Sequence, residues 1–122
     1  MPGTLNTFNP VSPIKANGFY SFVITVPNND VYSFSPKGTC GHIFISSVGA
    51  AHHGLFWWRG SAQNKYSGAA TTVGLNSVLT GTTGTVGNTT FGTSGGVLYI
   101  ENRSGAAAEY IVTLITENSA YE

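Results

Sequence analysis

Residues 19–26 read Phe19-Tyr20-Ser21-Phe22-Val23-Ile24-Thr25-Val26, and this alternation decides the fold class. Every second position carries a large apolar side chain: Tyr20, Phe22, Ile24 and Val26. The positions between them are mixed in polarity: Phe19, Ser21, Val23 and Thr25. A period of two sends alternate side chains to opposite faces of a strand, so the stretch predicts a half-buried β-strand with one face on a core.

Similar short patterns recur along the chain, separated by Gly, Pro, Asn and Ser. Together with residues 19–26 they predict eight strands, at 31–35, 39–48, 53–59, 77–80, 85–91, 97–101 and 109–116. A long polar loop is expected over 60–70, and the last two strands are expected to form a hairpin through Asn102-Arg103-Ser104-Gly105. Because no segment has a helical period, the prediction is an all-β, eight-stranded antiparallel sandwich or barrel.

Charge is scarce in this chain. Five basic and five acidic side chains make up 8% of the 122 residues and cancel to a formal net charge of zero, while 41% of the residues are hydrophobic. An ordinary soluble domain carries roughly a quarter charged residues. We therefore expect a domain whose surface is covered by other protein. No basic stripe exists, so neither nucleic acid nor a membrane surface is an expected partner.

No targeting or spanning segment is expected. The first 17 residues lack a positive start and an apolar block, and nowhere do 18 apolar residues run together. The single cysteine, Cys40, cannot form an internal disulfide, which is typical of a protein made in a reducing cytoplasm.

Residues 1–17 have three prolines and no hydrophobic period of a strand or helix. They predict an extended N-terminal arm, followed by a β domain over 18–117 and a short C-terminal tail over 118–122. An arm with little core-forming power is most easily ordered by lying on a neighbouring protein. The candidate partner-binding residues are Leu5, Phe8, Pro10, Val11, Pro13 and Ile14.

The aromatic run Trp57-Trp58 has two interpretations, and Tyr66 in the following loop shares them. Alternation sends the two tryptophans to opposite faces, so one is expected in the core and the other outside it. An outside aromatic residue can anchor a subunit contact or stack on the apolar face of a sugar ring. The subunit contact is preferred, because the composition already indicates a partner.

The residues that could carry catalysis or bind a metal do not form a complete site. Gly92-Thr93-Ser94-Gly95-Gly96 has the spelling of a nucleophile elbow, but no His and no Asp follow Ser94. Glu101 and Glu109 flank one predicted turn and are expected to be solvated or paired with Arg103. The possible zinc ligands are Cys40, His42, His52 and His53, of which the last two are adjacent and point to opposite faces. We expect no catalytic residue, no metal and no cofactor.

The closing stretch, from Gly95-Gly96-Val97-Leu98-Tyr99-Ile100-Glu101 to Glu109-Tyr110-Ile111-Val112-Thr113-Leu114-Ile115, resembles the end of small bacteriophage structural β domains. The likeness covers about the last quarter of the chain, and the Thr/Gly-rich middle is similar to jelly-roll modules that decorate capsids or tip tail fibres. The resemblance implies a jelly roll of two sheets, often trimeric, without catalytic residues.

The resemblance leaves two functions open. The first is a capsid decoration (cement) protein: a homotrimer on the outer surface of the virion, made in the host cytoplasm, that binds several copies of the major capsid protein by avidity. The second is the receptor-binding head of a tail or head fibre, with Trp57 or Trp58, Tyr66 and loop 60–70 holding a host glycan. The short arm after Met1 favours the first, since fibre heads usually follow a long shaft.

Overall fold

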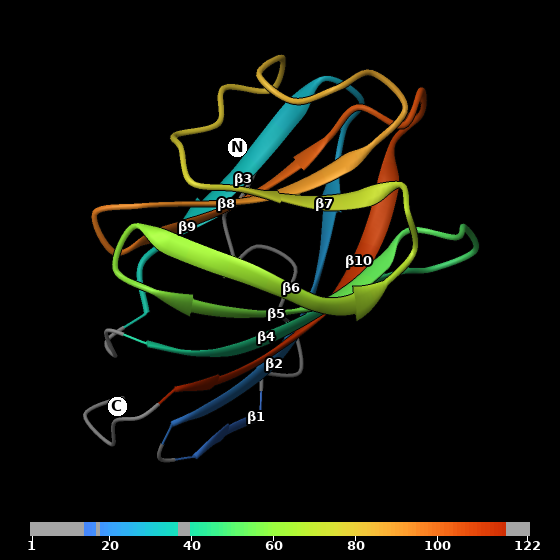
Figure 1. The fold of residues 1–122 in the computed structure, drawn as a ribbon. Helices are drawn as coiled ribbons and strands as arrows, with labels where there is room; N and C mark the ends of the chain where they lie inside the picture. Colours follow the sequence, from blue (N-terminus) through green and yellow to red (C-terminus); the bar gives the residue numbers. More distant parts are fainter. Residues whose placement is uncertain (1–13, 17, 37–39, 117–122) are drawn as a thin grey trace.

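Two β-sheets face each other in the computed structural model, which describes residues 14–16, 18–36 and 40–116 (Figure 1). Ten strands and no helix are found in these ranges. No helix long and apolar enough to span a membrane occurs there. The all-β sandwich predicted from the sequence is confirmed, with ten strands in place of eight.

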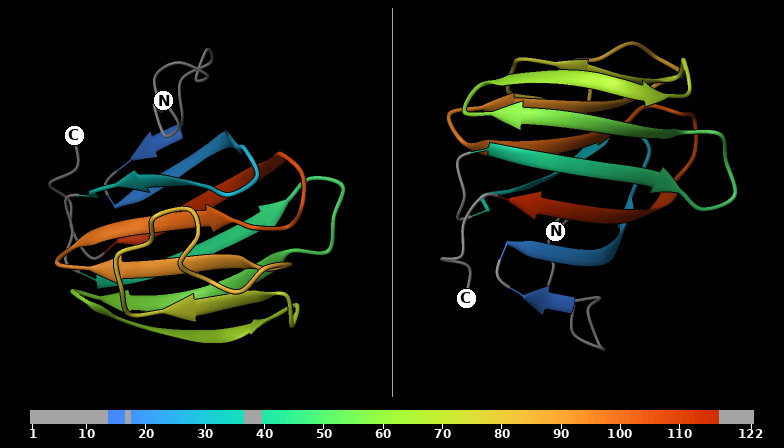
Figure 2. Two further views of the ribbon diagram at one scale, coloured as in Figure 1. Left: turned by 90° about the horizontal axis from the view of Figure 1, so that it is seen from above. Right: turned by 60° about the horizontal axis from the view of Figure 1, so that its bottom comes forward.

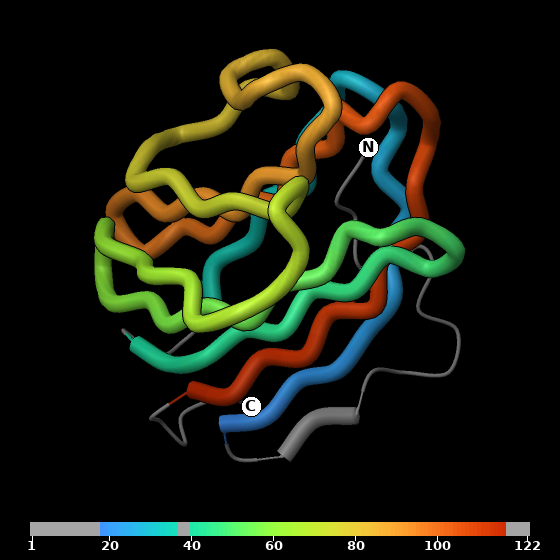
Figure 3. Tube along the Cα trace, turned by 45° about the vertical axis from the view of Figure 1, so that its right-hand side comes forward, coloured from blue at the N-terminus to red at the C-terminus, as the bar shows by residue number. Residues whose placement is uncertain are grey.

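The larger sheet has six antiparallel strands. Its order is β1 (Ile14–Ala16), β2 (Phe19–Val26), β10 (Ala108–Thr116), β4 (Cys40–Ser47), β5 (His53–Arg59) and β6 (Ala62–Gly68). The last strand of the chain therefore lies between β2 and β4, where it pairs along its length with both (Figure 3). The first strand, β1, falls inside the segment predicted as arm; the rest of the arm (1–13 and 17) and the tail (118–122) lie outside the described residues.

The smaller sheet has four strands in the order β3 (Asp30–Phe34), β9 (Val97–Asn102), β8 (Thr89–Ser94) and β7 (Thr72–Leu75). Strands β7 and β8 are parallel, so the prediction of a wholly antiparallel sheet is wrong at this edge. The connection between them is the long loop 76–88, which makes the parallel pairing possible because parallel neighbours need a crossover of a dozen or more residues.

In the middle of the chain the structure differs from the sequence prediction at four places. Residues 62–68 form the edge strand β6 instead of a loop, and residues 77–80 are a loop instead of a strand. Strand β8 starts at Thr89, four residues after the predicted start at 85, and β7 was not predicted. An edge strand such as β6 needs no apolar face, so its polar residues carry no strand signal.

The last two strands do not form the predicted hairpin, because β9 belongs to the smaller sheet and β10 to the larger. Asn102 holds the corner between them. Its side-chain amide donates hydrogen bonds to the carbonyl oxygens of Val26 and Ala106, at 2.8 and 2.7 Å, and its Oδ1 accepts one from the backbone N–H of Ser104. This buried amide joins the ends of β2 and β9 and redirects the chain to the other sheet.

The core lies between the sheets and contains the side chains that the alternation of residues 19–26 predicted to share a face. Phe22, Ile24 and Val26 are buried, and Tyr20 packs against them. Strands β4, β5 and β10 of the same sheet contribute Ile43, Ile45, Phe56, Trp58, Tyr110, Val112 and Leu114. The opposing sheet contributes Tyr32, Phe91, Leu98 and Ile100.

Loop 76–88 covers the outer face of the smaller sheet (Figure 2, left). Leu79 is buried there, and a Cβ on Gly92 would come within 2.7 Å of its side chain, so the glycine leaves the space that Leu79 fills. The covered face also holds Glu101, which is fully buried. Its carboxylate accepts hydrogen bonds from the backbone N–H groups of Gly81, Thr83 and Gly84, at 2.8, 2.9 and 2.7 Å.

The expectation that Glu101 is solvated or paired with Arg103 is therefore wrong. Arg103 instead donates to the carbonyl oxygens of Thr82 and Gly84 and to Oδ1 of Asn29. The carboxylate and the guanidinium bind the same loop through its N–H groups and its carbonyl oxygens respectively. A charge on a buried carboxylate is tolerated when several hydrogen bonds satisfy it, and here backbone donors do so.

We predict that Glu101→Gln lowers the free energy of unfolding by about 2 to 3 kcal/mol, because an amide removes the charge and turns an NH2 group toward backbone donors. Chemical denaturation measures the change. Glu109→Gln is the control, since Glu109 is exposed. Equal effects of the two substitutions would contradict the role assigned to Glu101.

A second prediction concerns the buried tyrosines. Burial raises the pKa of Tyr32, whose hydroxyl has no hydrogen-bond partner among the described residues. Burial also raises the pKa of Tyr110, although the 2.7 Å hydrogen bond with Thr89 opposes this in part. In the unfolded protein these tyrosines have the usual pKa of 10.0 and lose their protons above that pH, whereas in the folded protein they stay protonated. The unfolded state is therefore favoured increasingly, and the free energy of unfolding falls, as the pH rises above about 10.

Denaturation of matched variants across this pH range separates the two hydroxyls. Tyr32→Phe should cost little at neutral pH and reduce the alkaline loss of stability. Tyr110→Phe should cost about 1 kcal/mol at neutral pH, because it breaks the bond with Thr89. A larger neutral-pH cost for Tyr32→Phe than for Tyr110→Phe would be the opposite result.

Candidate functional site

The outer face of the larger sheet is the part of the molecule that the fold leaves uncovered. No described segment lies across it, in contrast to loop 76–88 on the other side (Figure 2). We call this the outer face, and define it by three rows of side chains that the strand registers place side by side. Each row crosses β2, β10, β4 and β5 in that order.

The registers give the residues of each row directly. The first row is Phe19, Ile115, His42 and Trp57. The second row is Ser21, Thr113, Phe44 and Leu55, and the third is Val23, Ile111, Ser46 and His53. Seven of these side chains are large and apolar, and none is Lys, Arg, Asp or Glu. The charges of this face stand beyond the rows, Arg59 beside Cys40 at one end and Glu109 beside Thr25 at the other.

Several of these apolar side chains are open to solvent in the single chain. Phe44 is 48% exposed, Ile115 50%, Ile111 44% and Val23 39%. Isolated exposed apolar residues are normal, but a contiguous patch with polar residues at its rim is typical of a contact with another protein. The outer face is such a patch, built on the central strands of a sheet and not on a loop.

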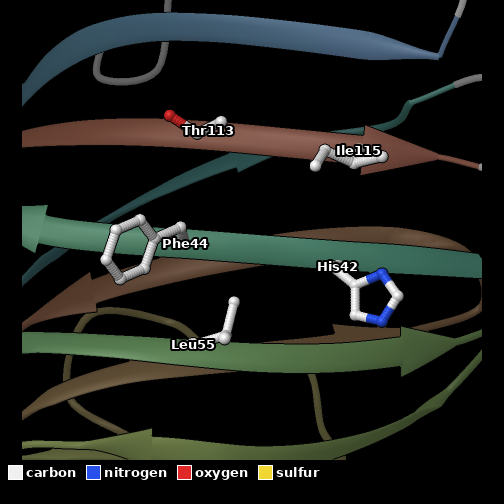
Figure 4. Close-up of a pocket in the computed structure, with 5 residues that line it drawn as sticks. All are labelled: His42, Phe44, Leu55, Thr113 and Ile115. Carbon is white, nitrogen blue, oxygen red and sulfur yellow. The ribbon is translucent and has the colours of Figure 1, made fainter.

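Two shallow hollows lie in the outer face around His42 and Ile115. One, of about 210 Å³, is lined by His42, Phe44, Leu55, Thr113 and Ile115, which project from β4, β5 and β10 on the same side of the sheet (Figure 4). The other, of about 280 Å³, lies beside it and is lined by Cys40, Gly41, His42, Trp57, Ile115 and Thr116. A cavity of about 150 Å³ holds a benzene molecule, so each hollow has room for one large apolar side chain.

His42 is held in place by Tyr66. The two rings are stacked, with centroids 5.7 Å apart, and the Tyr66 hydroxyl lies 3.3 Å from Nε2 of His42. A bulge in β6, where the register with β5 shifts between Leu55 and Phe56, lets Tyr66 reach over β5 to β4. The sequence placed Tyr66 in a loop, so only the strand register revealed that it reaches the outer face.

Trp57 and Trp58, two of the predicted interface or glycan residues, lie on opposite faces of β5, as the alternation of a strand requires. Trp58 is fully buried in the core, which removes it from any surface site, while Trp57 is half-buried on the outer face. Trp58 has room because position 41 is glycine: a Cβ there would collide with the carbonyl oxygen of Ile115 and lie 2.8 Å from the Trp58 ring. Of the arm candidates, Leu5, Phe8, Pro10, Val11 and Pro13 lie outside the described residues, and only the backbone of Ile14 is described, in β1.

The possible zinc ligands and Ser94, the serine of the elbow-like motif, do not come together in one site. His52 contacts Thr89 through Nδ1 at 3.2 Å, and His42 contacts Tyr66. Within residues 18–36 and 40–116, no group of three or more His, Cys, Asp or Glu side chains is placed to hold a metal ion. Ser94 ends β8, and Gly95 and Gly96, with φ of 58° and 85°, form the tight turn into β9.

Alternation over residues 39–48 puts His42 and Phe44 on one face, but the sequence did not single out Leu55, Ile111 or Ile115. For Ile111 and Ile115 a signal is present in residues 109–116, where both alternate sets contain large apolar residues. Such a pattern is typical of a central strand that is covered on both faces. In the described chain only one face of β10 is covered.

Comparison of the chain with protein-family models, with curated protein sequences and with solved structures gave no match.

We predict that the two tryptophans differ sharply in their effect on stability. Trp58→Ala should lower the free energy of unfolding by about 3 to 5 kcal/mol, because it opens a large cavity in the core. Trp57→Ala, matched in size and adjacent in sequence, should cost less than about half of that. Denaturation at a low, fixed protein concentration makes the comparison, and similar losses for both would show that Trp57 also belongs to the core.

Proposed function

We propose that this protein is a structural protein of a bacteriophage particle: a trimeric decoration (cement) protein that binds the major capsid protein on the outer surface of the capsid. The observation that carries the proposal is the outer face, whose three rows are largely apolar and contain no Lys, Arg, Asp or Glu, on the central strands of the larger sheet. This surface and the overall scarcity of charge support contacts with other protein chains, and the proposed role requires no catalysis and no cofactor.

The energetic argument starts from the exposure of these side chains. Burying a fully exposed large apolar side chain contributes about 1.5 to 3 kcal/mol; the side chains of the outer face are about half exposed, so each contributes roughly half of this, before the entropic cost of association. The outer face offers several such side chains close together, including Phe44, Ile111 and Ile115. Copies of the protein that bind one another can then bind several capsid subunits at once, and avidity strengthens the attachment without strong individual contacts.

We also propose that the sandwich is a modified jelly roll. Two features support this topology: the first long strand, β2, pairs with the last, β10, which in turn pairs with β4, and β3 pairs with β9 in the opposite sheet. The hairpin of β5 and β6 extends the larger sheet beyond that arrangement.

A glycan-binding fibre head remains the second candidate, because Trp57 and Tyr66 both reach the outer face beside His42. Specific sugar sites need polar side chains that converge on hydroxyl groups. The first hollow is instead lined by Phe44, Leu55 and Ile115, with Thr113 and His42 as its polar members. In the second hollow the polar members are Cys40, His42 and Thr116, beside Trp57 and Ile115. This composition favours apolar side chains of a protein over a sugar.

The proposal predicts that Phe44→Asp abolishes both trimer formation and binding to capsids, because burying an unpaired carboxylate opposes association. Light scattering at micromolar concentration measures the first, and co-sedimentation with phage capsids lacking the protein measures the second. Ser33→Asp is the matched control, since Ser33 is exposed on β3 of the other sheet. A wild-type protein that is monomeric and does not sediment with capsids, but binds host-surface glycans, would establish the second candidate instead.

A further inference from the structure

We propose that the outer face of one copy is covered by residues 5–13 of a second copy, with Phe8 placed in the hollow lined by Phe44, Leu55 and Ile115. This deepens the proposed function and rests on its premise that the outer face is a protein contact. It names the occupant of that face, which the capsid role by itself does not.

The composition of the segment matches the surface. Residues 1–13 contain no Asp, Glu, Lys or Arg, as the three rows of the outer face contain none. A charged segment would lose its hydration over the apolar rows without finding a partner there. An uncharged segment with large apolar side chains meets no such penalty.

The spacing of the segment also matches the sheet. Its large apolar residues recur at every third position: Leu5, Phe8 and Val11. Pro10 and Pro13 favour the extended polyproline II conformation, which repeats every three residues and advances about 9.3 Å per repeat, so these residues would share one side. Neighbouring strands lie about 4.8 Å apart. A segment crossing the strands therefore brings an apolar side chain over every second strand.

The length of the segment is sufficient. Nine residues in this conformation extend about 28 Å, and the six strands of the larger sheet span about 24 Å from the first strand axis to the last. One segment can thus cross every strand that contributes to the rows. Its aromatic side chain, Phe8, is of the size that a hollow of about 210 Å³ accepts.

The position of β1 favours a second copy over the same chain. β1 lies in the plane of the larger sheet at its edge, and Ile14 pairs with Ser21. Followed backward from Ile14, the direction of β1 leads along β2, past Val23 and Thr25, within the plane of the sheet. Pro13 has no N–H for continuing a β ladder. To reach the outer face of its own molecule from Ile14, the chain would have to reverse out of the plane of the sheet, whereas a neighbouring molecule can present its outer face without such a reversal.

The test uses full-length chains and compares Phe8→Asp with Thr7→Asp. The control adds the same charge at a neighbouring position that is not one of the large apolar residues of the segment. We expect Phe8→Asp to convert the oligomer to monomer by light scattering. We also expect it to raise the acrylamide quenching of tryptophan fluorescence about twofold, since Trp57 becomes uncovered while Trp58 stays in the core. Thr7→Asp should retain the mass and the quenching of the wild type.

A mixing experiment decides whether the segment acts between copies. Phe8→Asp has an intact outer face, and the double variant Phe44→Asp, Trp57→Phe has an intact segment and no tryptophan on its outer face. If the segment binds in trans, adding an excess of the double variant restores protection of Trp57 in Phe8→Asp and produces a species larger than one chain. The inference is overturned if mixing neither protects Trp57 nor produces a larger species. It is also overturned if the wild-type protein is a monomer in which Trp57 is already protected from quenching.

The outcomes separate this inference from the proposed function. If Phe44→Asp dissociates the oligomer while Phe8→Asp leaves mass and quenching unchanged, the outer face is a protein contact but residues 5–13 are not its occupant, and the inference is wrong. If the mixing experiment succeeds and the wild-type oligomer does not bind phage capsids, the inference stands and the capsid role fails.

Discussion

The pairing of β10 with both β2 and β4 is the interaction on which the structure depends. These strands are brought together from opposite ends of the chain, and without β10 the larger sheet would divide into β1–β2 and β4–β5–β6. Tyr110, Val112 and Leu114 on the inner side of β10 are all fully buried and close the core from that side. Such contacts between distant parts of a chain are slow to form, because loop-closure entropy is lost before they become favourable.

A sandwich of two sheets has two sides that face away from the core, and in this protein only one of them is covered by a described segment of the chain. Over the smaller sheet, Glu101 and Arg103 bind the N–H groups and carbonyl oxygens of loop 76–88, and Leu79 fills the space above Gly92. Over the larger sheet, Ile111, Ile115 and Phe44 stand exposed. One face is therefore completed within the chain, while the other has the composition of a surface that another chain completes.

This asymmetry gives a physical meaning to the low charge of the chain. A protein that stays apart from others gains solubility from surface charge. Here Arg59 and Glu109 are confined to opposite ends of the outer face, beyond its apolar rows. Charges within the rows would resist burial, so their scarcity is consistent with a surface that functions by packing. The proposed trimer and the proposed contact with residues 5–13 both assign this surface to contacts with other protein chains.

The sequence by itself determined the all-β class, the faces of β2 and β4, and the separation of Trp57 from Trp58, because alternation is a local property of each strand. It did not reveal β6, whose polar edge pattern resembles a loop, or the burial of Glu101, whose three donors lie in loop 76–88.

Only the tertiary structure decided that β9 and β10 separate into different sheets and that Ile111, Phe44 and Leu55 become neighbours. The physical reason is that strand partners and covering loops are chosen by contacts between residues far apart in the chain, which no local pattern records.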